Sequence, residues 1–501
     1  MSVLSSTRHR HSGLSAALAS RVAIDARALA AFRIGLGCTL LLDLLLRLRN
    51  LRTFYTDAGV LPVSQLAEQS PLLARFSLHA QSGDAWFQAL LFALAGIAAV
   101  ALVVGYKTRL ATLVSLGFLL SLHARNPHVL SAGDALLQHL LVWSLLLPLG
   151  SRWSVDAQQH ETGHDRVVSL ATAGLLVQVL LVYGVNAILK TRSEQWMTGE
   201  ATATVFGLDR FTILLGPLLR DVPLVLDIGH WVWLALLLVS PLLVVTTGRL
   251  RTALVGAFAA MHLGMVLTLY IGIFPVVCLV ALLPFLQTGV WETLARTRVA
   301  RRLRPWLGRT VAAGADTLPR WSPARAALSG DTHRLRQSVA AAGLGGLVLF
   351  NAVALGFVPV PPPADDTSSG DRPEPRWTMF APHPTDTDRW FVAPGNLSSG
   401  DRIDAFHQRD LTWERPEHIA RTYSSARMRK YMSNLRYDDR LQRSFASHLC
   451  DRWSRTHETD LLSVSVYAIE TPARAGDGSS RERIELVTFS CAASASPPRT
   501  G

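Results

Sequence analysis

Residues 28–48, which read ALAAFRIGLGCTLLLDLLLRL, form an apolar run long enough to cross a lipid bilayer. A helix rises 1.5 Å per residue, so about 20 largely apolar residues span the hydrocarbon core. The preceding residues 1–27 are polar and basic and lack the short apolar stretch of a cleavable signal, so we expect the run itself to direct insertion. This stretch therefore predicts an integral membrane protein.

Similar apolar runs recur through most of the chain. We expect about nine spans, with a margin of about one, because two runs are short and one pair has almost no connecting loop. The expected spans are 28–48, 85–105, 110–123, 134–149, 167–189, 229–247, 252–269, 270–286 and 338–358. Pro217 and Pro223 interrupt residues 211–228, which we interpret as a re-entrant or interfacial piece.

The distribution of charge predicts the orientation of these spans. Charged residues make up 17% of the chain, fewer than in ordinary soluble domains, yet the net charge is +12. With the N-terminus inside, the inside segments carry about 20 lysines and arginines and the outside loops about 7. This bias predicts a multi-pass protein of the cell (inner) membrane with a cytoplasmic N-terminus. Contact with the anionic lipid bilayer accounts for the positive charge, and no nucleic-acid partner is expected.

The C-terminal part of the chain has a soluble composition. Residues 359–376 are rich in Pro, Asp, Ser and Gly, which predicts a semi-rigid stalk followed by a flexible linker. In residues 377–501 we expect two strands within 389–406 around a turn at Pro394-Gly395-Asn396. Helical spacing follows in 417–453, and alternation predicts strands at 462–469 and 484–489.

The predicted fold class is an all-α polytopic membrane bundle with a C-terminal extracytoplasmic α+β domain. The expected domains are a basic cytoplasmic segment at 1–27, a transmembrane domain at 28–295, a basic cytoplasmic loop at 296–337, a last transmembrane helix at 338–358, a Pro-rich linker at 359–376 and an extracytoplasmic domain at 377–501.

The four cysteines divide between the spans and the tail. Cys38 and Cys278 lie in spans and are expected to be small packing residues. Cys450 and Cys491 lie in the tail, in a compartment expected to be oxidising, where they form a disulfide or remain two thiols. A disulfide closing this loop of roughly 40 residues would contribute about 4 kcal/mol. No Cys or His spacing typical of a metal site and no phosphate-binding glycine motif occurs, so no metal is predicted.

Ionisable residues within the spans are costly and indicate packing or functional roles. Asp43 and Arg47 are four residues apart and can pair on one helix face, either to fix packing or to relay a proton or substrate. His139 and His262 are each expected to be hydrogen-bonded packing residues. Lys190 ends the fifth span, where it either extends to the headgroups or, set against the bundle, serves as a base.

Short motifs along about residues 25–295 carry a family resemblance. They are Phe32-Arg33-Ile34-Gly35 with Asp43 and Arg47, Phe54-Tyr-Thr-Asp-Ala-Gly-Val-Leu-Pro62, Gly105-Tyr-Lys-Thr-Arg109, Arg125-Asn-Pro-His128, Trp153-Ser-Val-Asp156, Tyr183 with Lys190, Trp196 and Gly199, and His262 with Gly272-Ile-Phe-Pro275 and Trp291. Together they resemble the HTTM family, the membrane domain shared with vitamin K-dependent gamma-glutamyl carboxylase. The tail motif Trp377-Thr-Met-Phe-Ala-Pro382, followed by Trp390, is similar to extensions on bacterial members.

The resemblance implies candidate site residues. The family's carboxylases use a lysine at the outer membrane edge to deprotonate reduced vitamin K, and reaction with oxygen then yields a base that deprotonates a glutamate before carbon dioxide adds. By resemblance, Lys190 is the candidate base, and His128 with Asn126 lies near the family's catalytic histidine. Trp196 and Tyr183 are the candidate cofactor-binding residues. A proline interrupts the Asn-Asn-His run of the carboxylase here, so this correspondence is approximate.

Three functions stay open from the sequence. The resemblance favours a bacterial quinol-dependent enzyme at the outer membrane face, of the carbon–carbon ligase or quinol epoxidase type, using reduced menaquinone or a vitamin K-type quinone. The alternative is a non-catalytic maturation factor or scaffold whose tail binds an exported peptide or protein. A transporter is the third possibility, because the Pro-interrupted segment after Lys190 could line a cavity.

Overall fold

The computed structural model describes residues 17–159, 165–298, 301–302, 312, 314–320, 329–358, 377–473 and 481–491. The expected linker at 359–376 lies outside the described residues, as do parts of the basic segments expected at 1–27 and 296–337.

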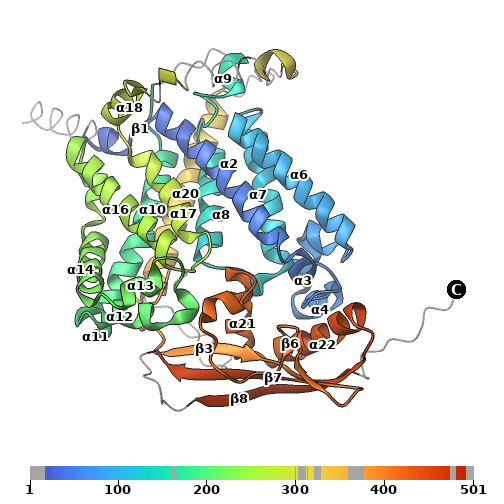
Figure 1. The fold of residues 1–501 in the computed structure, drawn as a ribbon. Coiled ribbons are helices and arrows are strands. Elements are labelled where there is room, and N and C mark those ends of the chain that lie inside the picture. The colour runs from blue at the N-terminus through green and yellow to red at the C-terminus, as the bar shows by residue number, and fades with distance from the viewer. Residues whose placement is uncertain are drawn as a thin grey trace, which may run out of the picture.

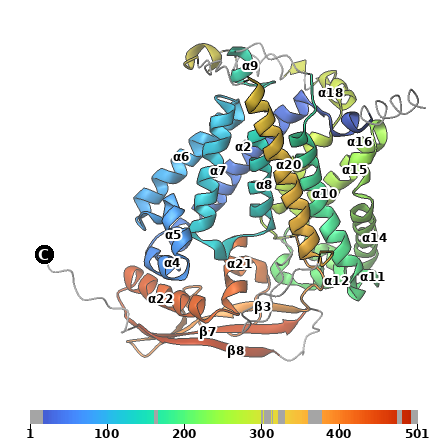
Figure 2. The same ribbon diagram turned by 180° about the vertical axis from the view of Figure 1, so that it is seen from behind.

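The N-terminal part of the chain is a bundle of helices (Figures 1 and 2). Five of the described helices are long and apolar enough to cross a membrane: α2 (Ala26–Leu48), α6 (Ala85–Val104), α10 (Leu170–Thr191), α16 (Gly248–Thr268) and the Arg334–Ala354 part of α20 (Ser329–Ala354). A broken span, Phe274–Phe285 with Thr288–Ala295, is bent by 100° and raises this number to at most six. The expected number of about nine spans is therefore not confirmed within the described part of the chain.

Shorter elements complete the bundle and its two ends. Three of the remaining helices run along the bundle: α7 (Thr108–Arg125), α8 (Ala132–Leu146) and α14 (Pro223–Val239). The broken span consists of α17 (Phe274–Leu282), η4 (Leu283–Phe285) and α18 (Thr288–Ala295). The connecting elements are β1 (Ile24–Asp25), α3 (Leu51–Tyr55), α4 (Val63–Gln69), α5 (Pro71–Phe76), η1 (Leu78–Ala80), η2 (Pro127–Val129), α9 (Val155–Gln159), β2 (Arg166–Val167), α11 (Glu194–Met197), α12 (Glu200–Gly207), η3 (Asp209–Phe211), α13 (Gly216–Arg220) and α15 (Leu242–Val245).

Residues 211–228 were expected to form one piece interrupted by two prolines, but both prolines lie at the start of a helix. Pro217 lies in the first turn of α13, and Pro223 is the first residue of α14. The first turn of a helix has no intrahelical acceptor for its N–H groups, so a proline is tolerated there and starts a helix instead of breaking one. The helix expected to begin at residue 229 therefore begins at Pro223 and ends at Val239.

Arg33 of α2 joins several segments at one end of the bundle. Its buried guanidinium donates to the carbonyl oxygens of Val103 at 3.3 Å and of Trp153 at 2.6 Å, and so joins α2 to the C-terminal end of α6. Gly105 ends α6 with φ +72°, and a Cβ there would lie 2.4 Å from Arg33 Nη1. Only glycine suits this position, because it tolerates a positive φ and leaves room for the guanidinium.

The C-terminal domain covers the opposite end of the bundle, called the domain-facing end below (Figures 1 and 2). Its helical elements are η5 (Ile419–Thr422), α21 (Ala426–Leu435) and α22 (Asp439–Thr456). Its strands are β3 (Thr387–Val392), β4 (Pro394–Leu397), β5 (Arg402–Asp404), β6 (Arg409–Asp410), β7 (Leu461–Pro472) and β8 (Glu482–Ser490). The sheet order is β3-β7-β4-β5-β6, with β8 also paired to β7, and α21 and α22 lie between the sheet and the bundle.

The expected strands at 462–469 and 484–489 are confirmed as the antiparallel pair β7 and β8. The expected turn at Pro394-Gly395-Asn396 is wrong, because these residues belong to strand β4, which pairs with both β5 and β7. Gly395 serves close packing there, since an added Cβ would lie 2.6 Å from Leu461 Cδ1. The turn falls instead before β5, where Gly400 has φ +90°. The helix expected over 417–453 is divided into η5, α21 and α22.

Candidate functional site

Lys190 lies in the last turn of α10, at the domain-facing end of the bundle, and is 2% exposed. The helix begins at Leu170, directly after the N-cap residue Ser169, whose side chain accepts a hydrogen bond from the Thr172 N–H. Residues three or four positions apart share a helix face, so Tyr183, Asn186 and Lys190 all project from one buried stripe of α10. Lys190 therefore points into the protein instead of extending to the membrane surface.

The Lys190 amine is held by a carbonyl and an aromatic face. Its Nζ donates to Met379 O at 3.2 Å and lies 3.1 Å from the centre of a Trp196 ring. In the described part of the chain no carboxylate forms an ion pair with Lys190. Lysines that are buried without a paired charge are the kind that enzymes use as general bases.

The tail segment Trp377–Pro382 completes the surroundings of Lys190. Asn186 Nδ2 donates to Trp377 O at 2.5 Å, and Trp196 Nε1 donates to Phe380 O at 3.0 Å. Met379 and Phe380 have φ angles of +31° and +62°, which residues with a side chain adopt only where their surroundings hold them. This backbone conformation turns two carbonyl oxygens of the tail toward α10 and α11.

A cavity of about 920 Å³ lies beside Lys190, between α10, α12, α14, α16 and the C-terminal domain. Its wall within the bundle is largely apolar and includes Leu226, Trp233, Met261, Met265 and Phe274. Its polar lining toward the C-terminal domain includes Asn186, Lys190, Arg210, Arg389, Arg429 and Lys430. A volume of this size suits a cofactor or a small amphipathic molecule.

Of the two candidate cofactor-binding residues, only Trp196 lines this cavity. Tyr183 lies deeper in the bundle, where its hydroxyl is 3.0 Å from His262 Nε2 and its ring stacks on the His262 ring. Both side chains are buried. The Tyr183–His262 pair therefore satisfies two polar groups inside the bundle without lining the cavity.

His128 and Asn126 lie at η2, and neither lines the Lys190 cavity. Asn126 Nδ2 donates to Phe54 O at 3.1 Å, and Asn126 Oδ1 accepts from the His128 N–H at 3.2 Å. The His128 carbonyl oxygen accepts from Asn434 Nδ2 of α21 at 2.8 Å. Burial lowers the pKa of His128, so its ring is neutral at pH 7. These contacts join η2 to α3 and α21, and the structure does not bring Asn126 or His128 to Lys190.

Asp43 and Arg47 pair at 2.7 Å within a larger buried cluster. Arg47 Nη2 also contacts Asp134 Oδ1 at 2.7 Å, which joins α2 to α8. Arg427 of the C-terminal domain enters the same cluster, with its Nη2 at 2.5 Å from Asp43 Oδ1 and at 2.7 Å from Asp134 Oδ1. Two arginines thus balance two aspartates, and this cluster attaches α21 to the bundle.

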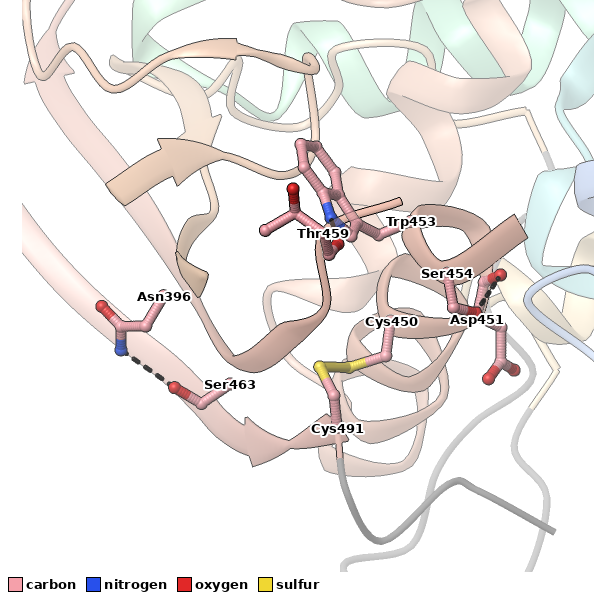
Figure 3. Close-up of a disulfide and its surroundings, with 8 residues drawn as sticks. All are labelled: Asn396, Cys450, Asp451, Trp453, Ser454, Thr459, Ser463 and Cys491. Atoms are coloured by element: carbon pink, nitrogen blue, oxygen red, sulfur yellow. Dashed lines mark hydrogen bonds between the residues drawn. A yellow bond between two sulfur atoms is a disulfide. The ribbon is translucent and has the colours of Figure 1, made fainter. Parts of the chain in front are cut away.

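Cys450 of α22 and Cys491 after β8 are joined by a disulfide, with their Cα atoms 5.4 Å apart (Figure 3). Beside it, Trp453 Nε1 donates to Thr459 O at 2.8 Å. The disulfide links helix α22 to the strand at one side of the sheet. Cys278 is buried, whereas Cys38 is exposed on the surface of the bundle. Among the described residues no group of three or more His, Cys, Asp or Glu side chains could hold a metal ion.

Sequence reasoning missed the contribution of α21 to both sites. Arg427 joins the buried ion cluster, and Arg429 and Lys430 line the Lys190 cavity. The available signal was the basic stretch Arg427-Met-Arg-Lys430, which closely follows the helix cap at Ser425. More than 200 residues separate this stretch from Lys190, so only the fold brings them together.

Comparison with known proteins identifies the membrane part of the chain. A family model described as the HTTM domain matches residues 22–291, which is more than half of the chain. The matched region contains α2 through α17 and Lys190, whereas the C-terminal domain lies outside it. The comparisons with curated proteins and with solved structures find no match.

Proposed function

The chain belongs to the HTTM-domain family of membrane proteins, and we propose that it is a carboxylase-like, quinol-dependent enzyme in which Lys190 is the general base. One observation carries this proposal: a lysine amine lies buried beside a cavity of about 920 Å³ without a paired carboxylate in the described residues. A base next to a large, mostly apolar cavity suits proton removal from a hydrophobic substrate.

We place the domain-facing end of the bundle, with Lys190 and the C-terminal domain, on the extracytoplasmic side of the cell membrane. The excess of arginine in the segments expected inside supports this orientation. The Cys450–Cys491 disulfide supports it as well, because such bonds persist in oxidising compartments outside the cytoplasm.

The residues around the cavity fit a reduced quinone. Trp233, Met261 and Phe274 offer apolar and aromatic surface for a ring. The buried Asn186 Oδ1 has no hydrogen-bond partner among the described residues and could accept one from a ring hydroxyl. A bound quinol of the menaquinone or vitamin K type would supply an acidic hydroxyl and reducing equivalents for oxygen.

The chain's own groups would position and accept the proton. Lys190 Nζ is the acceptor, and Met379 O together with the Trp196 ring holds it in place. Phe380 O fixes Trp196 in turn through its indole N–H. The segment Trp377–Pro382 excludes water from this end of the cavity, because Trp377 is fully buried against the bundle.

The test is quinol oxidation by the full-length protein reconstituted in lipid. With reduced menaquinone or vitamin K, wild type should oxidise the quinol in an oxygen-dependent reaction, and Lys190→Ala should lower the rate about 100-fold, as expected for loss of a general base. Arg443→Gln, which alters an exposed side chain of α22, is the matched control and should keep the wild-type rate. A wild type no faster than Lys190→Ala would refute the proposal.

A scaffold that binds an exported protein is the second candidate, because β8 pairs only with β7 in the described sheet. The free edge of a strand can accept a strand from another chain. If the C-terminal domain binds such a client, deletion of residues 377–501 should abolish maturation of the client. Unchanged maturation after this deletion would exclude the scaffold role.

A further inference from the structure

The Lys190 cavity carries more positive charge than its surroundings neutralise. Arg210 lies 3.9 Å from Asp388, and Arg389 pairs with Glu470 at 2.7 Å. The other basic lining residues are Arg429 and Lys430, with the Lys190 amine beside them, and no carboxylate of the described chain forms an ion pair with any of them. No Asp or Glu occurs among the described residues that line the cavity. The polar end of the cavity is therefore suited to an anion.

Arg429 shows this most directly. It is 8% exposed, its Nη2 donates to Tyr270 O at 3.0 Å, and its guanidinium lies 4.1 Å from the Phe211 ring centre. Its Nε is buried and has no hydrogen-bond partner among the residues that the structure describes. Burial and the charge of Arg210 lower the pKa of Arg429 to about 10, which leaves it cationic at pH 7. A buried guanidinium with an unused donor is costly unless a ligand completes it.

The apolar part of the same cavity reaches the outer surface of the bundle between α14 and α16. Val225 of α14 lines the cavity and is 45% exposed, and Ala260 of α16 lines it and is also exposed. Gly229 and Gly264 line it as well, and no atom lies within 4 Å of a Cβ added at either position. These helices are apolar on their outer surfaces, so in a membrane this opening faces lipid chains.

We infer that the cavity binds an anionic lipid from the surrounding membrane, with its phosphate against Arg429, Lys430 and Arg210 and an acyl or isoprenoid chain between α14 and α16. Guanidinium groups match phosphate oxygens in geometry and charge. Free phosphate would satisfy the basic groups but leave the apolar wall unfilled. A zwitterionic lipid would bring its own positive charge to a site that already has a surplus. The lipid site does not depend on a catalytic role for Lys190.

Lipid titration of the purified full-length protein, followed by native mass spectrometry, tests this inference. Phosphatidylglycerol, phosphatidylcholine and inorganic phosphate are the three probes. We expect phosphatidylglycerol to bind at least tenfold more tightly than phosphatidylcholine, and Arg429→Gln to weaken it about tenfold, as for the loss of a charge-assisted hydrogen bond. Arg443→Gln, an exposed arginine outside the cavity, should bind like wild type.

A second variant keeps the charge and blocks the space. Gly264→Leu places a side chain in the open part of the cavity without removing a contact, so it should fold normally and weaken phosphatidylglycerol binding about tenfold. Equal affinity for both lipids, or Arg429→Gln binding like Arg443→Gln, would overturn the inference. Inorganic phosphate that binds as tightly as phosphatidylglycerol would overturn the assignment to a lipid. Because binding is measured without quinol, its failure is separate from failure of Lys190 as a base.

Discussion

Arg427 and Arg429 stand two residues apart on α21, yet they meet the bundle in opposite electrostatic states. Arg427 belongs to the paired junction, defined as Asp43, Arg47, Asp134 and Arg427. Arg429 belongs to the unpaired junction, defined as Lys190, Arg429 and Lys430, none of which forms an ion pair with a carboxylate of the described chain. The comparison separates a contact that the protein completes by itself from one that a ligand would complete.

Helix geometry explains how neighbouring residues reach such different surroundings. Two residues advance about 200° around a helix, so Arg427 and Arg429 leave α21 on opposite faces. Although burial alone would lower it, the carboxylates of Asp134 and Asp43 raise the pKa of Arg427 well above its usual range. Burial and the charge of Arg210 lower that of Arg429. One helix thus carries both the attachment of the C-terminal domain and the basic lining of the cavity.

The largest expected effect comes from breaking the paired junction. Arg427→Met leaves Asp43 and Asp134 buried with only Arg47 to balance them, which should lower the free energy of unfolding by about 4 kcal/mol. Unfolding by a denaturing detergent, followed by tryptophan fluorescence, measures this change. Arg443→Gln is the control. A loss below about 1 kcal/mol would show that the pairing does not attach α21.

The second prediction concerns the effect of pH on stability at another contact between the C-terminal domain and the bundle. This contact is made by His448 of α22. Its Nδ1 lies 3.0 Å from Ala58 O, and burial lowers its pKa from 6.5 to about 4. Between these two values the unfolded chain binds a proton that the folded chain does not. Stability is therefore complete above pH 6.5 and falls by about 3 kcal/mol as the pH drops to 4.

The matched variant for this experiment is His448→Gln, which cannot titrate. The difference in unfolding free energy between wild type and His448→Gln should shrink as the pH falls from 6.5 to 4. A difference that stays constant over this range would mean that His448 does not titrate on unfolding.

The third prediction concerns the unpaired junction. Arg429→Met removes a buried cation that has no ion-pair partner in the described chain, so stability should stay the same or rise by about 1 kcal/mol in lipid-free detergent. The same unfolding assay as for Arg427→Met applies. A loss as large as that of Arg427→Met would remove the distinction between the two junctions.

The smallest expected effect is that of Gly264→Leu on stability. Leucine has a higher helix propensity than glycine, and the added side chain meets open space, so α16 should gain about 0.5 kcal/mol. Thermal unfolding monitored by circular dichroism measures this gain. Marked destabilisation would indicate that the cavity is closed in solution.

Local patterns in the sequence predicted several features correctly. The spacing of Asp43 and Arg47 placed them on one helix face, and alternation located β7 and β8. The general rules that proline breaks a helix and that glycine marks a turn gave wrong predictions here. Pro223 starts a helix, and Gly395 lies inside a strand, because hydrogen bonding and packing against distant residues decide what a proline or glycine does.

The sequence by itself determined that the chain is a helical membrane protein with a β-rich C-terminal part, and that it belongs to the HTTM family. These properties follow from hydropathy and short motifs, which are local. Only the tertiary structure decided which charges are paired. Arg427 meets Asp43 and Asp134 across 384 and 293 residues of chain, and the Met379 carbonyl oxygen meets Lys190 across 189. Charge pairing depends on distances in space, and no local pattern specifies them.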